Sequence, residues 1–236
     1  MDLIRLNKYL KDIGICSRRK ADEFIEKGFI KVNGNTITEL GFKINPATDK
    51  LDILPDLAEE TAKFRYILLN KPCGYVCSKS DMDGRTIFEL LPKIEGLTYA
   101  GRLDKESSGL LILSNDGKFV YSVAGSEFAC EKEYMVRVNK PLTQNYLYYQ
   151  GNGLIKLDGK QVKPAKVKMI DDFRYHITLK EGMNRQIRRM AENQGYKVLD
   201  LERIRIDKIR DDNLNLGKWR DLNDIEIKYF TTVVKK

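Results

Sequence analysis

The chain has 236 residues, of which 42% are hydrophobic and 32% are charged, and it carries a formal net charge of +8. This length suits one large domain or two smaller ones, and the excess of Lys and Arg favours a polyanionic partner such as nucleic acid. No apolar run approaches the about 20 residues that a membrane-spanning helix needs, and the charged N-terminus does not resemble a signal peptide. We therefore expect a soluble cytoplasmic protein that has no membrane partner.

Histidine and cysteine limit the chemistry that this chain can perform. It has one histidine, His176, and four scattered cysteines, of which only Cys73 and Cys77 are close together. This pattern lacks the spacing of a zinc site, and the sequence has neither a Walker loop nor a G-x-G-x-x-G motif. We therefore expect no metal and no nucleotide cofactor, and any acid–base chemistry would use carboxylates or tyrosines.

The first 50 residues are predicted to form two helices and a hairpin. Apolar residues at helical spacing predict a first helix that ends at Gly14 and a second that runs from an N-cap at Ser17 to Gly28. The stretch FIKVNGNTI predicts a hairpin around an Asn-Gly turn. Basic residues on or beside both helices favour an RNA-binding surface over a merely solvated face. The candidate contacts are Arg5, Lys8, Arg18, Arg19 and Lys20.

The segment RLNKYLKDIGICSRRKADEFIEKGFIKVNG resembles the S4 RNA-binding domain. This resemblance implies that the partner is a structured RNA, such as an rRNA stem-loop. Modules of this kind are fused to many unrelated enzymes, so the resemblance indicates a partner class and no reaction. The acidic stretch from Leu54 to Phe64 is predicted to be a linker, which gives an S4-like domain with linker at 1–60 and a larger domain at 61–236.

The larger domain is predicted to be an α+β domain with a mixed, mostly antiparallel sheet flanked by helices, because strands dominate and do not alternate regularly with helices. The strand EKEYMVRV carries Tyr134, and IKLDGKQV predicts a hairpin around Asp158-Gly159. The stretch NRQIRRMAENQG predicts a helix with Asn184 as its N-cap and Gly195 beyond its end.

Asp104 lies in the stretch AGRLDKESSGLLILSNDG, two residues after Arg102 and shortly before the apolar run Leu110–Leu113. An isolated acid in a turn is usually a solvated ion pair. This acid is attached to a core strand, however, and the chain offers no catalytic group based on histidine or metal. Asp104 is therefore the first candidate for a catalytic carboxylate.

A second basic segment lies on the predicted helix that follows residue 184. Its apolar residues share one face, whereas Arg185, Arg188 and Arg189 share another. We expect one of these arginines to point at a carboxylate and the others to bind RNA phosphates. An aspartate beside a guanidinium group stays ionised even when it is partly desolvated, as a nucleophile requires.

GRLDKESSGLLILSNDG resembles the G-R-L-D-x-x-[ST]-x-G-L-L signature of RNA pseudouridine synthases of the RsuA class, with Ser107 where threonine is more usual. LNKPCGYVCS, EKEYMVRV, EGMNRQIRRM and LGKWRDL resemble further motifs of this family, in the family's order. Lys71 and Tyr75, in the first of these, are interpreted as structural. The form NRQIRRM is most similar to the large-subunit (23S) rRNA enzymes of the RluF type.

The resemblance implies that a uridine in rRNA is isomerised to pseudouridine without a cofactor, after the base has been flipped out of its helix. It implies that Asp104 is the nucleophile or key carboxylate and that Tyr134 packs against the uracil. It also implies that Arg188 pairs with the aspartate and that Arg102 enters the space left by the extruded base. Arg185 and Arg189 are then RNA contacts.

Several alternatives remain. A small-subunit (16S) rRNA or tRNA pseudouridine synthase is the nearest of them. A catalytically silent ribosome-assembly protein would lack Asp104 or Tyr134, and both are present. An S4-containing methyltransferase would need a glycine-rich cofactor loop, and a DNA-binding regulator would use 17–27 as its recognition helix. The sequence implies no protein partner, and we expect a monomer.

Overall fold

The computed structural model describes residues 3–13, 15–16, 18–53, 64–80, 84–125 and 130–233. The predicted helix end at Gly14, the N-cap at Ser17 and nearly all of the predicted linker lie outside these residues. The chain divides into two compact units, of which the first comprises 1–66 with the short segments 94–98 and 114–120. The second unit comprises 67–93, 99–113 and 121–236.

None of the helices in the described part of the chain has the length and apolar character that a membrane crossing requires.

The first unit contains the predicted helices and hairpin. Its helices are α1 (Leu6–Asp12) and α2 (Arg18–Glu26), and its strands are β1 (Ile4–Arg5), β2 (Ile30–Val32), β3 (Asn35–Ile37), β4 (Lys43–Ile44) and β5 (Leu51–Ile53). β2 pairs antiparallel with both β3 and β5, and β1 pairs with β4. Buried apolar side chains from both helices and the strands form its core, which includes Leu6, Leu10, Phe24, Ile30 and Val32.

The turn between β2 and β3 confirms the predicted hairpin. Asn33 and Gly34 have φ values of 51° and 81°, which is the left-handed geometry that a two-residue turn of this kind requires. Gly28 has a φ of 72° just after α2 and donates its N–H to the carbonyl of Ile25, as expected for a glycine that ends a helix.

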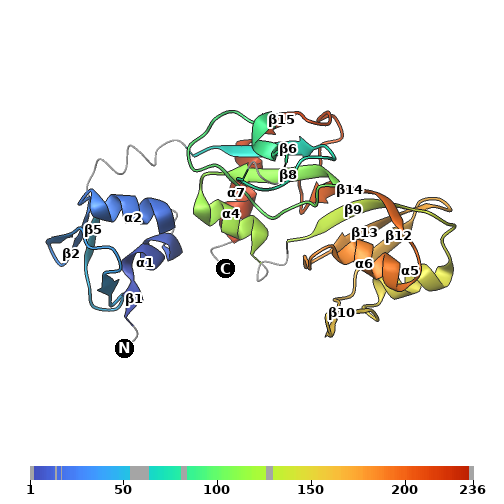
Figure 1. Cartoon of the computed structure of the whole chain (residues 1–236), viewed down its shortest axis with the longest axis horizontal. Helices are drawn as coiled ribbons and strands as arrows, with labels where there is room; N and C mark the ends of the chain where they lie inside the picture. Colours follow the sequence, from blue (N-terminus) through green and yellow to red (C-terminus); the bar gives the residue numbers. More distant parts are fainter. Residues whose placement is uncertain are drawn as a thin grey trace. The chain divides into compact units, whose positions relative to one another are not determined.

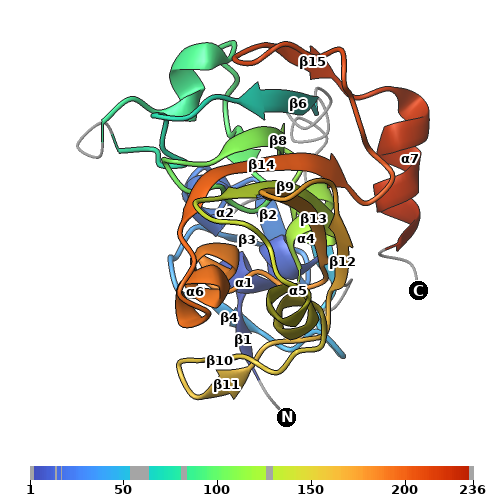
Figure 2. The same ribbon diagram turned by 90° about the vertical axis from the view of Figure 1, so that its right-hand side faces the viewer.

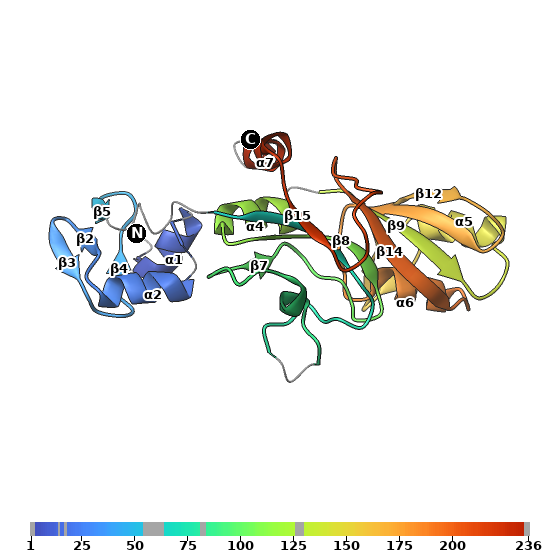
Figure 3. The same ribbon diagram turned by 90° about the horizontal axis from the view of Figure 1, so that it is seen from above.

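A mixed sheet dominates the second unit. Its strands are β6 (Tyr66–Lys71), β7 (Thr98–Tyr99), β8 (Ser108–Ser114), β9 (Lys132–Val138), β12 (Lys166–Met169), β13 (Arg174–Leu179), β14 (Val198–Ile206) and β15 (Trp219–Asp221). Their order is β12-β13-β9-β14-β8-β6-β15, which can be followed in Figures 1 and 2, and β7, which is labelled in Figure 3, pairs with β8. β14 pairs in parallel with β8 and antiparallel with β9. The prediction of an α+β fold with a mixed, mostly antiparallel sheet is confirmed.

Helices α5 (Gln144–Gly151) and α6 (Gln186–Asn193) lie together on one side of this sheet, beside β9 and β13 (Figures 1 and 2). The core between them and the strands includes Val136, Tyr146, Ile177, Met190 and Leu201. A hairpin of β10 (Lys156–Leu157) and β11 (Lys160–Gln161) adjoins this core. The remaining described helices are η2 (Ile87–Leu90), α4 (Gly117–Ala124) and α7 (Asp224–Val233).

Of three local features predicted in this unit, a hairpin turn and a helix end are confirmed, and an N-cap is wrong. Asp158 and Gly159 form the expected turn with φ values of 52° and 75°, and Gly195 follows α6 with a φ of 70°. The N-cap of α6 is Arg185 and not Asn184, and Arg185 has left-handed backbone angles of φ 49° and ψ 34°. The side chain of Gln186 accepts a hydrogen bond from the N–H of Met183 at 3.0 Å, which closes this turn without a cap from Asn184.

Candidate active site

The second unit contains a cleft of about 580 Å³ that is lined by the loop before β8, the start of β9 and the segment that enters α6. Arg102 and Asp104 come from the loop, Tyr134 from β9 and Arg185 from the entry to α6. Segments far apart in the sequence are thus brought together around one space. Three of the four predicted catalytic residues line this cleft, and the fourth, Arg188, lies within 4.0 Å of Asp104.

Lys71 holds the loop that carries Asp104. It stands at the end of β6, is fully buried, and donates hydrogen bonds to the carbonyl oxygens of Pro72, Asp104 and Ser107 at 3.0, 3.1 and 2.7 Å. Burial lowers the pKa of the Lys71 ammonium, against the opposing effect of nearby thiols and of Asp104. The two bonds to Asp104 and Ser107 attach the loop to the sheet, in keeping with the structural role that we expect for Lys71.

Arg188 reaches the same loop from α6. Its side chain is buried, and Nη2 donates to the carbonyl of Glu106 at 3.0 Å and to Oγ of Ser107 at 3.2 Å. Nη1 donates to the carbonyl of Val198 at 3.3 Å. Nε has no hydrogen-bond partner among the described residues, and it lies 4.0 Å from Oδ2 of Asp104. The guanidinium group is therefore fixed by neutral acceptors, and its free N–H is the one nearest the carboxylate.

Of the three arginines predicted to share one face of this helix, Arg188 is buried by its hydrogen bonds to the loop, whereas Arg185 is exposed. Arg189 is partly exposed and forms two hydrogen bonds with Asp158 in the turn between β10 and β11, at 2.9 and 2.6 Å.

Arg185 also faces Asp104. Its Nη1 lies 2.9 Å from Oε2 of Glu106 and 3.8 Å from Oδ2 of Asp104. The hydrogen bond from Arg185 lowers the pKa of Glu106. Two guanidinium groups therefore flank Asp104, one exposed and one buried. An RNA contact was expected for Arg185, and its place beside the carboxylate was missed because its left-handed backbone cannot be seen in a helical pattern.

Tyr134 and Arg102, which both line the cleft, differ in their exposure to solvent. Tyr134 is partly buried and lies between Ile177 on β13 and Arg203 on β14, its direct partners in the sheet. Arg102 is exposed. Tyr134 can therefore support a flat ring against the core, whereas the Arg102 side chain is open to solvent.

Two functional positions were missed or undervalued in the sequence. Ser107 is buried, and its hydroxyl accepts the hydrogen bond from Arg188. Serine therefore supplies here the same hydroxyl group as the threonine that is more usual in the signature. Gly109 has a φ of 107°, and a Cβ there would lie 2.3 Å from the carbonyl oxygen of Arg203. Only glycine allows β8 and β14 to approach this closely. The glycine in the signature was the available signal.

The predicted RNA contacts of the first unit lie on its surface. Arg5, Lys8, Arg18 and Arg19 are exposed. Lys20 is partly buried, forms an ion pair with Glu23 at 3.2 Å, and lies 5.2 Å from the centre of the Phe24 ring. None of these five residues lines the described cleft of the second unit.

Comparison with known proteins agrees with this geometry. Residues 65–193 match the family model for RNA pseudouridylate synthase, and residues 4–49 match the model for the S4 domain. The chain is 40% identical over 226 residues to the dual-specificity RNA pseudouridine synthase RluF of Escherichia coli O6:H1, an alignment that covers 95% of this chain and 77% of that protein.

Two further similarities extend over almost the whole chain. The ribosomal small subunit pseudouridine synthase A of Haemophilus influenzae is 32% identical over 229 residues, covering 95% of this chain and 98% of that protein. A crystal structure of a pseudouridylate synthase aligns with a TM-score of 0.71 at 30% identity, covering 96% of this chain and 99% of that one. The chain therefore belongs to the RNA pseudouridylate synthase family and carries an N-terminal S4 domain.

Proposed function

We propose that this protein isomerises a specific uridine to pseudouridine in ribosomal RNA, and that this RNA is the 23S rRNA. The observation that carries the proposal is the cleft in which Arg185 and Arg188 flank Asp104 while Tyr134 stands on a neighbouring strand. Membership of the RNA pseudouridylate synthase family supports the reaction. The product has the same atoms as the substrate, so no oxidant, reductant or group donor is needed.

In the proposed reaction the C1′–N1 bond breaks, the uracil turns, and C5 bonds to C1′. Asp104 either attacks C1′ or stabilises the positive charge that develops there, and Arg188 pairs with its carboxylate. Tyr134 packs against the uracil and is placed to take the C5 proton late in the reaction. The base must leave its helix because neither C1′ nor C5 can be reached in a stacked duplex, and Arg102 fills the space it leaves.

The large-subunit assignment rests on similarity. Identity to RluF of Escherichia coli is 40%, against 32% to the small-subunit enzyme of Haemophilus influenzae. The small-subunit activity remains the second candidate because that alignment also covers nearly the whole of both chains. The description of RluF as a dual-specificity enzyme keeps a second RNA, such as a tRNA, within the proposal.

The S4 domain supplies affinity for the RNA in this proposal. Arg5, Lys8, Arg18 and Arg19 present exposed positive charge that can contact phosphates without reading the base sequence. We place this domain and its linker in residues 1–60 and the catalytic domain in 61–236, and we propose that the enzyme acts as a cytoplasmic monomer without a cofactor.

Pseudouridine mapping of total RNA from cells with and without the gene tests the assignment. The proposal predicts that one uridine in 23S rRNA loses its modification when the gene is absent and regains it when the gene, but not its Asp104→Asn form, is restored. Loss of a 16S site instead would establish the second candidate. An unchanged map would refute both.

A further inference from the structure

Arg203 on β14 is a buried arginine that lines the cleft. It is 2% exposed, it lines the same space as Asp104 and Tyr134, and it is the direct partner of Tyr134 across the sheet. On the other side its partner is Gly109, which has no side chain. Directly paired residues project from the same face of a sheet, so the side chains of Arg203 and Tyr134 start from neighbouring positions on one face, and both line the cleft.

The guanidinium group of Arg203 is incompletely satisfied. Nε donates to the carbonyl oxygen of Leu110 at 2.6 Å, and this is the only hydrogen bond that Arg203 makes with residues the structure describes. Nη2 is buried and has no hydrogen-bond partner among those residues. Lys132, which lines the same cleft, donates to the carbonyl of Cys130 at 3.1 Å. Positive charge thus gathers here, and neither Arg203 nor Lys132 bonds a carboxylate of a described residue.

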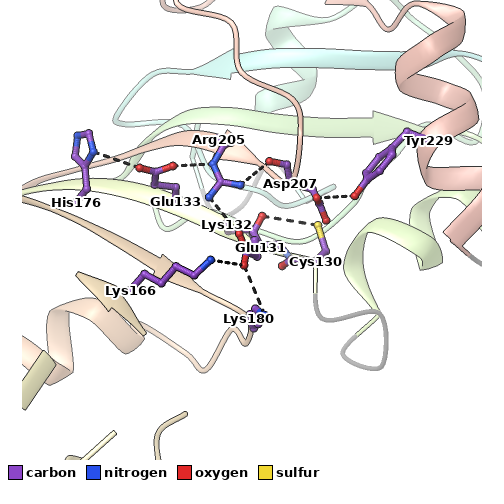
Figure 4. Close-up of polar contacts among 10 residues, drawn as sticks. All are labelled: Cys130, Glu131, Lys132, Glu133, Lys166, His176, Lys180, Arg205, Asp207 and Tyr229. Carbon is purple, nitrogen blue, oxygen red and sulfur yellow. Dashed lines mark hydrogen bonds and ion pairs between the residues drawn. The ribbon is translucent and has the colours of Figure 1, made fainter. Parts of the chain in front are cut away.

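Arg205, two residues further along the same strand, provides a contrast, because its guanidinium donors have carboxylate and carbonyl partners. A register shift between Arg203 and Arg205 puts Arg205 opposite Glu133. Its nitrogens contact Glu133 at 2.7 Å, Glu131 at 3.3 Å and the carbonyl of Asp207 at 2.6 Å (Figure 4). Unpaired buried donors are costly, so an arginine left with open donors in a cleft calls for an acceptor from outside the chain.

We infer that Arg203 donates a hydrogen bond to a carbonyl oxygen of the flipped uracil and stabilises the negative charge that the base acquires during the reaction. This inference rests on the proposed function and adds a residue to it. Asp104 acts at the sugar, whereas Arg203 acts at the base, and Tyr134 beside Arg203 supports the ring between them.

The reaction places negative charge on the base, and a cation such as Arg203 stabilises it. When the C1′–N1 bond breaks, its electron pair stays with the uracil, and the charge spreads over N1, O2 and O4. C5 then bonds to C1′, the C5 proton departs, and N1 gains a proton, which restores a neutral base. A preorganised cation that meets this charge in a site sheltered from water stabilises the transition state more than the ground state. A contact to O4 would also favour uracil over cytosine, which presents an amino group at C4, whereas a contact to O2 would not discriminate between them.

The test is a double-mutant cycle between the protein and single atoms of the RNA. Synthetic rRNA fragments carry uridine, 4-thiouridine or 2-thiouridine at the target position, and each is converted by full-length wild-type enzyme, Arg203→Met and Arg203→Lys. Single-turnover rates at saturating enzyme are read by nucleoside chromatography. Sulfur is the weaker acceptor, so we expect one thio substitution to slow the wild-type enzyme by about 10- to 100-fold, the range for a hydrogen bond to a charged group.

The inference predicts that Arg203→Met slows the uridine substrate by a comparable factor and then shows almost no further loss with that thio substrate. Arg203→Lys, which keeps the charge, should retain part of the coupling and serves as the test if Arg203→Met does not fold. Arg205→Met is the matched control, since it removes a nearby arginine and should leave the thio effect at its wild-type size.

If the rate losses from Arg203→Met and from the thio substitution multiply independently for both 4-thiouridine and 2-thiouridine, Arg203 has a structural role only. Coupling found instead with a methylphosphonate at the 5′ phosphate would assign Arg203 to the phosphate and overturn its role at the base. Failure of the wild-type enzyme to convert any rRNA fragment would refute the proposed function itself, so the two failures are distinguishable.

Discussion

The carboxylate of Asp104 is 29% exposed, yet its Oδ2 atom has guanidinium nitrogens of Arg185 at 3.8 Å and of Arg188 at 4.0 Å. The two arginines differ in what holds them. Arg185 is exposed and bonded to Glu106. Arg188 is buried and bonded to a carbonyl and a hydroxyl oxygen of the loop that carries Asp104. We therefore propose that Arg188 is the preorganised partner of Asp104 and that Arg185 can exchange Glu106 for RNA.

We predict that Arg188→Ala lowers the single-turnover rate of pseudouridine formation by about 100- to 1000-fold, the effect typical of removing one preorganised donor. The loss is incomplete because water can replace part of the charge. The variant should also melt at a lower temperature, since three hydrogen bonds to Glu106, Ser107 and Val198 disappear. Arg188→Lys should recover part of the rate.

Arg185→Ala is the matched comparison for that prediction. Because the Arg185 side chain is exposed, this variant should lower the single-turnover rate less than Arg188→Ala does and should change the stability little. Rates of folded Arg188→Ala within about threefold of wild type would contradict the role assigned to Arg188. A larger loss in Arg185→Ala than in Arg188→Ala would reverse the two assignments.

Helix α7 shows how a single arginine attaches an element to the catalytic domain. Arg220, on β15, bonds Asp211 at 2.6 Å and both carboxylate oxygens of Glu226 at 2.8 Å. Asn223 and Glu226 also exchange hydrogen bonds between side chain and backbone, which forms a capping box at the start of the helix. These contacts fix the N-terminal end of α7 to the loop before β15.

We predict that Arg220→Met lowers the free energy of unfolding by about 1–3 kcal/mol, the range for losing hydrogen bonds between charged groups. The effect depends on pH. The bond from Arg220 lowers the pKa of Asp211; burial raises the pKa of Glu226, but bonds from Arg220 and Asn223 outweigh it and lower that pKa too. The stabilisation is therefore complete above the ordinary values of 3.8 and 4.5 and is lost as the pH falls below them.

Chemical denaturation of the wild-type protein and Arg220→Met at pH 7 and across pH 5 to 3 measures this difference. The gap between the two proteins should narrow on the acid side. A gap that stays constant to pH 3, or that widens, would show that the ion pairs do not carry the stabilisation.

Turns and strand patterns were predictable at the scale of elements because their cues are local. Asn33-Gly34 and Asp158-Gly159 adopt the left-handed angles that their hairpins require, and the alternating strand around Tyr134 is present. The start of α6 was not predictable in the same way. The Arg185 backbone is left-handed because Gln186 closes the preceding turn, and its side chain pairs with Glu106, 79 residues away.

The candidate site was predictable only in part for the same reason. The signature stretch and its family resemblance located Asp104 and Arg188. Neither could show that Lys71 anchors the loop by its carbonyl groups, or that Arg203 stands beside Tyr134, because these contacts depend on sheet register and on burial.

The whole molecule combines an S4 domain with basic surface residues and a catalytic domain that contains the cleft. We predict that replacing Arg5, Lys8, Arg18 and Arg19 together by glutamine weakens RNA binding and lowers the dependence of log K on log salt by about 3, since each phosphate contact contributes about 0.7–0.9. The single-turnover rate at saturating enzyme should change less than about threefold, because these residues do not line the cleft.

Filter binding at several salt concentrations, with single-turnover assays beside it, checks this division of labour. A variant with Lys140, Lys168, Lys197 and Lys208 replaced by glutamine controls for net charge, since these lysines are exposed in the second unit and do not line the cleft. Unchanged affinity in the S4 variant together with a reduced rate at saturation would contradict the prediction.

The most direct test of the account is tritium release from rRNA labelled at C5 of uridine, measured under single-turnover conditions for the wild-type enzyme and Asp104→Asn. The amide is nearly isosteric with the carboxylate but lacks its charge, so it can neither attack C1′ nor stabilise a cation there. The account predicts release by the wild-type enzyme and none above background by a folded Asp104→Asn protein that still binds the RNA, a loss of many powers of ten at about 1.4 kcal/mol of barrier each. Near-normal release by that variant would contradict the central claim and reduce Asp104 to a charged residue in a turn.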